Sequence, residues 1–295
     1  MEYDKYIIFV AILLSTFTIL YYAKNKIIHH PLPPDPEKYE RFYQKILLLV
    51  GSKNNFNNFY VRTKDNVWLD TIYIKNPETD RCIIFFHGNE GNLTTRFELV
   101  KFLYNYASVV IFDYRSYGIS TGTVLLSDSF FREDAISIWE FTVYHLKFKP
   151  NNISFFGESF GCSIAIYLAA VLGSTMDSRY SPHSLICNAP LCSTRAIIES
   201  NFNRLNFGFF GKIISLLFGS NYQTIKLVKY ISYHTKIIIA HSPNDEIVPY
   251  TEGLDLYREI IRVHKNSVFV NITGTHNNLG LTDQYIYLLA DLFSN

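Results

Sequence analysis

The chain has 295 residues, 48% of them hydrophobic, which is enough for one α/β domain of catalytic size with a large core and a short appendage. Its 27 Lys and Arg residues are balanced by 26 Asp and Glu residues and form no basic stripe, which argues against nucleic acid as a partner. The four cysteines form no C-x-x-C pair, so we expect buried thiols and no metal site.

The first element expected from the sequence is a membrane anchor. Tyr6–Ala23 carries no charge, is about the length that crosses a bilayer, and contains Tyr21 and Tyr22 where an aromatic belt would lie. A cleaved signal peptide is the less favoured alternative because no small-x-small site follows, and a buried core helix is less favoured because the segment is apolar all round. We therefore predict a single-pass N-terminal anchor over residues 1–28, with its compartment and topology open.

A spacer is expected after the anchor. His29–Pro36 is rich in proline and predicts a stiff linker, and Glu37–Val50 predicts a short amphipathic helix that lies against the domain or the membrane surface. The paired histidines are a possible metal site, but no second ligand cluster follows, so a polar linker is the simpler interpretation. Residues 29–58 are accordingly predicted as spacer and short helix, ahead of a domain over residues 59–295.

Within the domain, short apolar runs alternate with segments of helix length. We expect an opening antiparallel pair at Phe59–Thr63 and Asn66–Ile74, and then a mostly parallel sheet, because the later runs are apolar throughout. The further strands are predicted at Arg81–Phe86, Ser108–Phe112, Ile153–Phe156, Ser184–Cys187, Lys236–Ala240 and Ser267–Val270. The helices are predicted at Leu93–Tyr104, Asp128–Leu146, Phe160–Leu172, Thr251–Val263 and Thr282–Phe293.

Residues 190–234 interrupt this alternation and are predicted to form an inserted cap, because the stretch is far longer than an ordinary connection between neighbouring strands. Its apolar side chains suit an acyl pocket or a membrane-facing lid. An additional packed helix with its own core contacts explains them equally well. These side chains are Phe202, Leu205, Phe207, Phe209, Phe210, Ile213, Leu216, Leu217 and Phe218.

A serine lies in a glycine-flanked turn between a predicted strand and a predicted helix. The sequence there is Gly157-Glu-Ser-Phe-Gly161, and G-x-S-x-G in this setting predicts a sharp turn that exposes Ser159 at the top of the sheet. Gly157 and Gly161 must be small, because larger side chains would collide with the neighbouring strand and helix. The motif alone is common by chance, and a glycine-rich structural turn is the alternative. Its setting makes Ser159 the candidate nucleophile.

A serine hydroxyl is a weak nucleophile at neutral pH and needs a histidine base that is oriented by an acid. In this kind of site the expected chain order is serine, acid, histidine. Asp245 and His276 each follow one of the last two predicted strands, so both fall on loops at the sheet edge that carries Ser159. Glu246 is the alternative acid.

Cleavage of an acyl group also requires backbone donors for the developing oxyanion. The loop His87-Gly-Asn-Glu-Gly-Asn92 follows a predicted strand at the same edge of the sheet. We assign the oxyanion hole to the N–H groups of Asn89 and Phe160, the second of which comes directly after the candidate nucleophile. His87 is interpreted as a side chain that braces the loop.

Taken in order, these motifs resemble an α/β-hydrolase and, more narrowly, the membrane-anchored serine hydrolases of the alpha/beta-hydrolase domain-containing protein 13 and 17 group. The apolar, cysteine-free N-terminus resembles the 13-type. Ser116 departs from the family's D-Y-R-G-Y-G pattern, and Ser242 replaces the glycine of its H-G pair before the acid. The matching motifs lie between about Val61 and Leu292 and are His87-Gly-Asn-Glu-Gly-Asn92, Asp113-Tyr-Arg-Ser-Tyr-Gly118-x-Ser120-x-Gly122, Gly157-Glu-Ser-Phe-Gly161, Asn244-Asp-Glu-Ile-Val-Pro249 and Gly274-Thr-His276-Asn277.

The residues predict ester or thioester hydrolysis with Ser159 as nucleophile, His276 as general base and then acid, and Asp245 as the group that orients the imidazole. The resemblance implies lipid esters or acylated membrane proteins as substrates, and no cofactor or metal. The alternative from a different class is a catalytically silent α/β-hydrolase domain that serves as a membrane-tethered binding module. Such domains normally lose a triad member or an elbow glycine, and this sequence keeps all of them.

Overall fold

The computed structural model describes residues 30–123, 129–175, 178–193 and 223–294, together with the single residues 15, 195 and 215. Apart from Ser15, the predicted anchor lies outside these residues, and so do the apolar side chains of the predicted cap. Among the helices that the structure describes, none is long and apolar enough to cross a membrane. The anchor, the cap and the boundaries after residues 28 and 58 therefore stay predictions.

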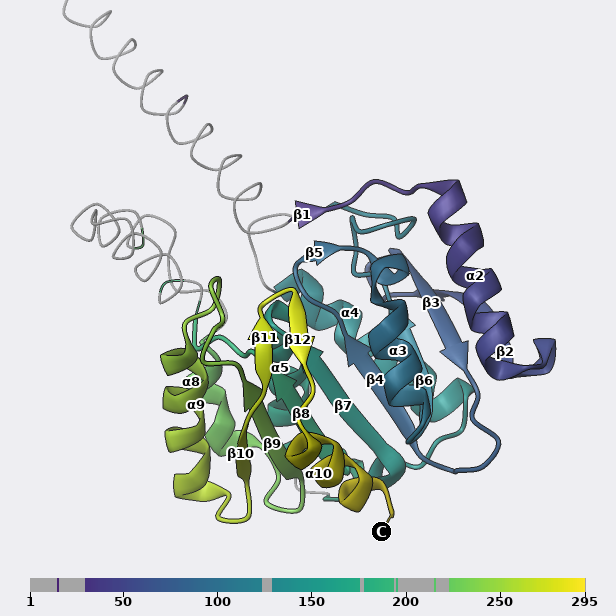
Figure 1. Cartoon of the computed structure of the whole chain (residues 1–295). Coiled ribbons are helices and arrows are strands. Elements are labelled where there is room, and N and C mark those ends of the chain that lie inside the picture. The colour runs from purple at the N-terminus through teal and green to yellow at the C-terminus, as the bar shows by residue number, and fades with distance from the viewer. Residues whose placement is uncertain are drawn as a thin grey trace, which may run out of the picture.

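An eight-stranded sheet forms the centre of the described chain (Figure 1). Its strands are β2 (Phe56–Arg62), β3 (Trp68–Ile74), β4 (Cys82–Phe86), β6 (Ser108–Phe112), β7 (Ile153–Glu158), β8 (Ser184–Asn188), β9 (Lys236–His241) and β10 (Val268–Asn271). They lie in the order β10-β9-β8-β7-β4-β6-β3-β2, and every neighbouring pair is parallel except the two pairs that contain β3. The predicted antiparallel opening and mostly parallel sheet are confirmed.

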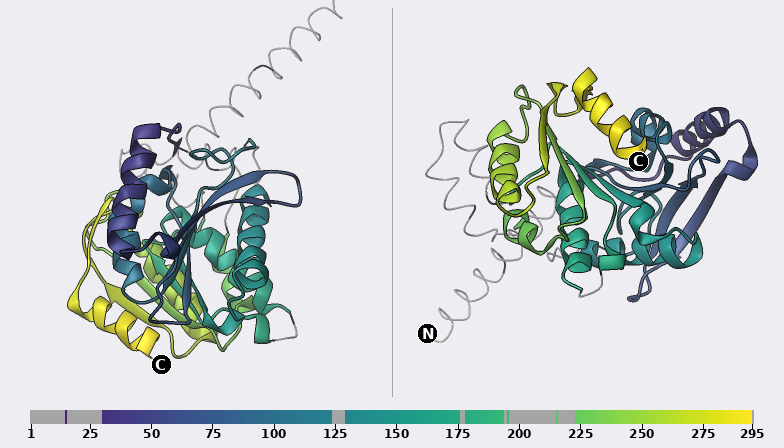
Figure 2. Two further views of the ribbon diagram at one scale, coloured as in Figure 1. Left: turned by 90° about the vertical axis from the view of Figure 1, so that its right-hand side faces the viewer. Right: turned by 90° about the horizontal axis from the view of Figure 1, so that it is seen from below.

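Helices cover both faces of this sheet, as the view from below shows (Figure 2). One face carries α2 (Pro36–Val50), α3 (Phe97–Tyr104) and α10 (Asp283–Ser294), and the other carries α4 (Ser129–Glu140), α5 (Phe160–Gly173) and α9 (Tyr250–Val263). The central strands are buried on both faces, with Ile83 and Phe85 in one cluster and Ile84 and Phe86 in the other. This double burial explains why their sequences are apolar throughout.

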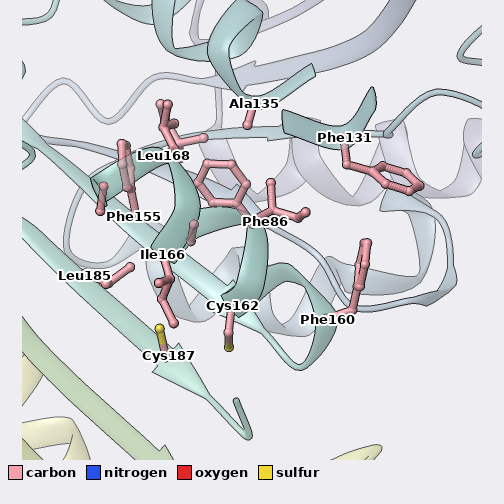
Figure 3. Packing of buried hydrophobic residues seen from close by; sticks show 14 of the residues in the cluster. Phe86, Phe131, Ala135, Phe155, Phe160, Cys162, Ile166, Leu168, Leu185 and Cys187 are labelled. Carbon is pink, nitrogen blue, oxygen red and sulfur yellow. The ribbon is translucent and has the colours of Figure 1, made fainter. Parts of the chain in front are cut away.

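The cluster beneath the serine turn is drawn in Figure 3. Phe86 of β4 meets Phe155 of β7 edge to face at 5.5 Å, and Phe160 of α5 meets Phe131 of α4 at 5.3 Å. All four cysteines are free and buried, as predicted. Burial raises the pKa of the Cys162 thiol well above its ordinary value, which keeps it uncharged inside the core.

Helix α2 packs on the domain, which was one of the two locations predicted for it. The helix begins after Asp35, whose carboxylate accepts the N–H groups of Glu37 and Lys38, and it ends at Gly51 in a left-handed conformation. Its buried side chains, spaced three and four residues apart, are Tyr39, Phe42 and Ile46. They join the cluster that α3 and α10 also cover.

Three local features differ from the predicted elements. The helix expected at Leu93–Tyr104 begins with a 3₁₀ turn, η2 (Leu93–Arg96), and only then continues as α3. The helix expected at Asp128–Leu146 ends in a π-helical turn, η3 (Phe141–His145). A short strand, β1 (His30–Pro31), pairs in parallel with β5 (Glu90–Gly91), so part of the predicted spacer lies along the loop that follows β4.

Candidate active site

Ser159 lies in a strained turn between β7 and α5. Its φ of 51° and ψ of −116° place the backbone in a conformation that L-residues rarely adopt. A Cβ at Gly157 would lie 2.6 Å from Cα of Cys162, and a Cβ at Gly161 would lie 2.0 Å from the carbonyl oxygen of Phe86. Both positions therefore require glycine, as the sequence predicted, and the turn keeps the serine at the carboxyl edge of the sheet.

The structure brings the three predicted residues together. His276 lies in the turn of a hairpin formed by β11 (Thr273–Thr275) and β12 (Asn278–Gly280), beyond the end of β10. Its Nε2 is 3.0 Å from Oγ of Ser159, and its Nδ1 is 2.7 Å from Oδ2 of Asp245. Ser159 and His276 each keep 9% of their surface exposed, so the serine hydroxyl and the imidazole lie at the edge of solvent.

The carboxylate of Asp245 is fixed from several sides. Its Oδ1 accepts the backbone N–H groups of Ile247 at 2.9 Å and Val248 at 2.7 Å. The imidazole of His241, fully buried, has Nε2 3.4 Å from Oδ2 of the carboxylate. Burial alone would raise the pKa of Asp245, but the hydrogen bonds from His241 and His276 hold it well below its ordinary value. The group is therefore a carboxylate at neutral pH.

Glu246, the alternative acid, does not take this place. Its Oε2 accepts the backbone N–H of His276 at 3.1 Å, so it contacts the main chain of the histidine and leaves the imidazole to Asp245. Ser242 adds a further connection, because its Oγ donates a hydrogen bond of 2.6 Å to the carbonyl of Gly274. The serine that departs from the family's H-G pair thus joins the acid loop to the histidine hairpin.

The loop after β4 carries the predicted oxyanion donor Asn89. The side chain of Asn89 accepts a 2.9 Å hydrogen bond from the hydroxyl of Tyr117, and the N–H of Gly88 donates to Oε2 of Glu158 at 3.2 Å. His87 is fully buried, its Nδ1 donates to the carbonyl of Gly88 at 2.7 Å, and it braces the loop as predicted. Phe160, the second predicted donor, is the first residue of α5, where backbone N–H groups have no partner within the helix.

Two polar side chains near the site were missed in the sequence. Glu158, within the G-x-S-x-G motif, forms a 2.6 Å ion pair with Arg96 of η2. Asp113, the first residue of the D-Y-R motif, is fully buried and accepts the N–H of Leu93 at 2.7 Å. Both residues belong to motifs that the sequence analysis had identified. Their role could have been suspected because each is a charged residue at a position where the chain is expected to be buried. Ser116, the other departure from the family pattern, holds a φ of 71° in the turn that follows.

The described residues contain no group of three or more His, Cys, Asp or Glu side chains that could hold a metal ion. The paired histidines at positions 29 and 30 were the one metal site considered from the sequence, and the first of them lies outside the residues described.

Comparison with known proteins identifies relatives at two levels of similarity, although no protein-family model matches the chain. The chain is 48% identical over 277 residues to the uncharacterized protein R595 of Acanthamoeba polyphaga mimivirus, and the alignment covers 94% of each protein. It is 28% identical over 242 residues to the lysophosphatidylserine lipase ABHD12 of Bos taurus, covering 78% of this chain and 57% of that protein. The chain thus matches little more than half of the lipase.

Solved structures share the fold, and two of them serve as examples. An alpha-beta hydrolase from Vibrio vulnificus superimposes with a TM-score of 0.68 at 18% identity, over 94% of this chain and 90% of that one. The esterase Pf2001 from Pyrococcus furiosus superimposes with a TM-score of 0.60 at 17% identity, over 81% of this chain and 91% of that one. At such low identity the similarity concerns the sheet and its flanking helices.

Proposed function

We propose that this chain, which has the α/β-hydrolase fold, is a serine hydrolase that cleaves carboxylic esters or thioesters through an acyl-enzyme. The observation that carries the proposal is the position of the His276 imidazole, 3.0 Å from Oγ of Ser159 and 2.7 Å from Oδ2 of Asp245. A base within hydrogen-bonding distance of the nucleophile, itself oriented by a carboxylate, is what activation of a serine requires.

The reaction begins when Oγ of Ser159 attacks the carbonyl carbon and Nε2 of His276 takes the hydroxyl proton. The charged Asp245 stabilises the imidazolium that forms, and the N–H groups of Asn89 and Phe160 stabilise the oxyanion. His276 then gives the proton to the departing alcohol or thiol, which leaves the acyl group on Ser159. Water attacks this acyl-enzyme with the same histidine as base, so the carboxylic acid is released and the serine is restored.

Lipid esters and acylated membrane proteins are the substrate classes that we propose. The name of the cattle relative, a lysophosphatidylserine lipase, supports a lipid ester. The predicted anchor over residues 1–28 would hold the domain near either substrate, and the predicted cap over residues 190–234 would lie on the chain between β8 and β9. Both are part of this proposal.

A fluorophosphonate probe tests the proposal, because it phosphonylates only a serine that is activated as a nucleophile. We expect the wild type to be labelled and Ser159→Ala to be unlabelled. Ser163→Ala is the matched control, since Ser163 lies one turn further along α5 and its hydroxyl is buried. A folded wild type that stays unlabelled would overturn the proposal in favour of a silent binding module, and labelling of Ser159→Ala would move the nucleophile elsewhere.

A further inference from the structure

A cavity of about 450 Å³ opens beside the imidazole of His276, on the face of the sheet that carries α3 and α10. Glu158 and Asn188, at the carboxyl ends of β7 and β8, lie along it together with His276. In the proposed reaction the departing group takes its proton from His276. The alcohol half of the substrate must therefore lie next to this histidine, and the cavity offers space for it there.

The charge of the cavity wall is negative. Arg96 is its one cationic side chain among the described residues, and all three guanidinium nitrogens are engaged: Nε with Glu158 at 2.6 Å, one terminal nitrogen with Oγ1 of Thr95 at 2.6 Å, and the other with the carbonyl of Glu90 at 2.7 Å. Its charge is balanced by Glu158. Glu90 and Glu98 are also among the lining residues, and neither carboxylate has a hydrogen-bond or ion-pair partner in the described part of the chain.

Asn188 gives a second and independent sign of a polar ligand. Its side chain is fully buried, and its Oδ1 accepts the hydroxyl of Tyr285 at 2.6 Å. Its Nδ2 has no hydrogen-bond partner among the described residues, which is costly for a buried amide. The backbone carbonyl of the same residue accepts the N–H of Ser159 at 2.8 Å, and Asn188 is among the residues that line the cavity. An oxygen of a bound alcohol would satisfy it.

We propose that this cavity binds the alcohol half of the ester and selects alcohols that carry an ammonium group, as in esters of amino alcohols. The proposal rests on the proposed hydrolysis. Leu99, Phe102 and Leu281 supply apolar surface for the carbon skeleton, and Glu90 and Glu98 attract the positive charge. A headgroup with net negative charge, such as the phosphodiester and carboxylate of the lysophosphatidylserine named for the cattle relative, would be repelled by the same two carboxylates.

Three butyrate esters with alcohols of different charge test the selection, with the release of acid followed at constant pH. They are butyrylcholine, its neutral isostere in which a tert-butyl group replaces the trimethylammonium group, and the butyrate ester of glycolic acid, which is an anion. We expect kcat/KM to fall in that order, with butyrylcholine favoured over its isostere by roughly threefold to tenfold, because the two carboxylates are exposed and partly screened. Higher ionic strength should reduce the ratio.

The double variant Glu90→Gln, Glu98→Gln should bring the ratio of kcat/KM for the cationic and neutral esters close to one, whatever its effect on the two separate rates. Glu259→Gln is the matched control, since it removes a carboxylate from α9, away from the cavity, and should keep the ratio. A wild type that cleaves all three esters without regard to charge, or a double variant that keeps the preference, would overturn the cavity proposal alone. Failure to cleave the neutral isostere or any other ester would instead overturn the proposed hydrolysis.

Discussion

The hydroxyl of Tyr39 donates a 2.9 Å hydrogen bond to Oδ2 of Asp113, which lies 74 positions further along the chain. The other oxygen of this buried carboxylate accepts the N–H of Leu93 and lies 3.4 Å from Nε2 of His87. Through its hydrogen bonds this carboxylate joins helix α2 to Leu93, at one end of the loop that carries Asn89. The pairing of β1 with β5 is a second connection between the N-terminal segment and the same loop.

We predict that Tyr39→Phe lowers kcat by about threefold to thirtyfold with little change in KM, because a looser loop weakens the Asn89 N–H as an oxyanion donor. Loss of a whole donor costs roughly 10²- to 10³-fold, so displacement of one should cost less. Tyr43→Phe is the matched control on the same helix, since its hydroxyl accepts from Asn58 and makes no bond to Asp113. Equal kcat in the two variants, measured well below their melting temperatures, would contradict a positioning role for Tyr39.

The proposed triad predicts a graded series of losses. Ser159→Ala and His276→Ala should each lower the turnover of a short p-nitrophenyl ester by roughly 10⁴- to 10⁶-fold without unfolding the protein. Asp245→Asn should lower it by roughly 10³- to 10⁴-fold, because the amide no longer fixes the imidazole tautomer or stabilises its charge. Glu246→Gln should cost far less, since Glu246 contacts the backbone of His276. If Glu246→Gln were the more damaging of the two, the acid would have to be reassigned to Glu246.

Asp70 predicts an unusual dependence of stability on pH. It is fully buried, with one oxygen accepting from Asn58 at 2.9 Å and the other without a partner among the described residues. Burial, reinforced by the nearby charge of Asp113, raises the pKa of Asp70 to about 7. In the unfolded chain the pKa is about 3.9, so between about pH 4 and about pH 7 the native state binds the additional proton, and stability falls as pH rises through this window.

The variant Asp70→Asn mimics the protonated acid and should lose this pH dependence. At about pH 8 its free energy of unfolding should exceed that of the wild type by roughly 1–4 kcal/mol, as measured by urea denaturation. Asp65→Asn is the control of opposite sign, because hydrogen bonds from Arg115 hold the pKa of Asp65 below its ordinary value and its stabilisation is lost as pH falls. A wild type and an Asp70→Asn variant whose stabilities change in parallel with pH would contradict this account.

The central strands and the serine turn could be predicted because their physical cause is local. An apolar run buried on both faces of a sheet is visible in the sequence, and so is a pair of glycines with a serine between them. The predicted strands ended early at Phe156, Cys187 and Ala240, because backbone pairing continues through polar residues that face the site. These residues are Glu158, Asn188 and His241.

The contacts that could not be predicted from the sequence are those between residues far apart along the chain. Nothing near Tyr39 indicates that its hydroxyl meets Asp113, and the two-residue strand β1 is too short to show a period of its own. The hairpin that holds His276 was missed for a different reason, since its strands are short, polar and rich in Thr, Asn and Gly. These contacts follow from the three-dimensional packing, and some of them hold the loop that carries Asn89.

Two truncations at the N-terminus distinguish the role of the predicted anchor from that of β1, which pairs with the loop that carries Asn89. Removing residues 1–28 keeps β1 and α2, so we expect wild-type kcat and melting temperature, and release of the protein from membranes if the anchor prediction is right. Removing residues 1–34 also deletes β1 and Leu32, whose N–H donates to the carbonyl of Gly91 at 3.2 Å. The helix α2 and its cap Asp35 remain, so the protein should stay folded while kcat falls several-fold as the loop loses one support. The rate of ester hydrolysis and the melting temperature are measured for both truncated proteins. An equal kcat for the two would show that β1 does not help to hold the loop that carries Asn89.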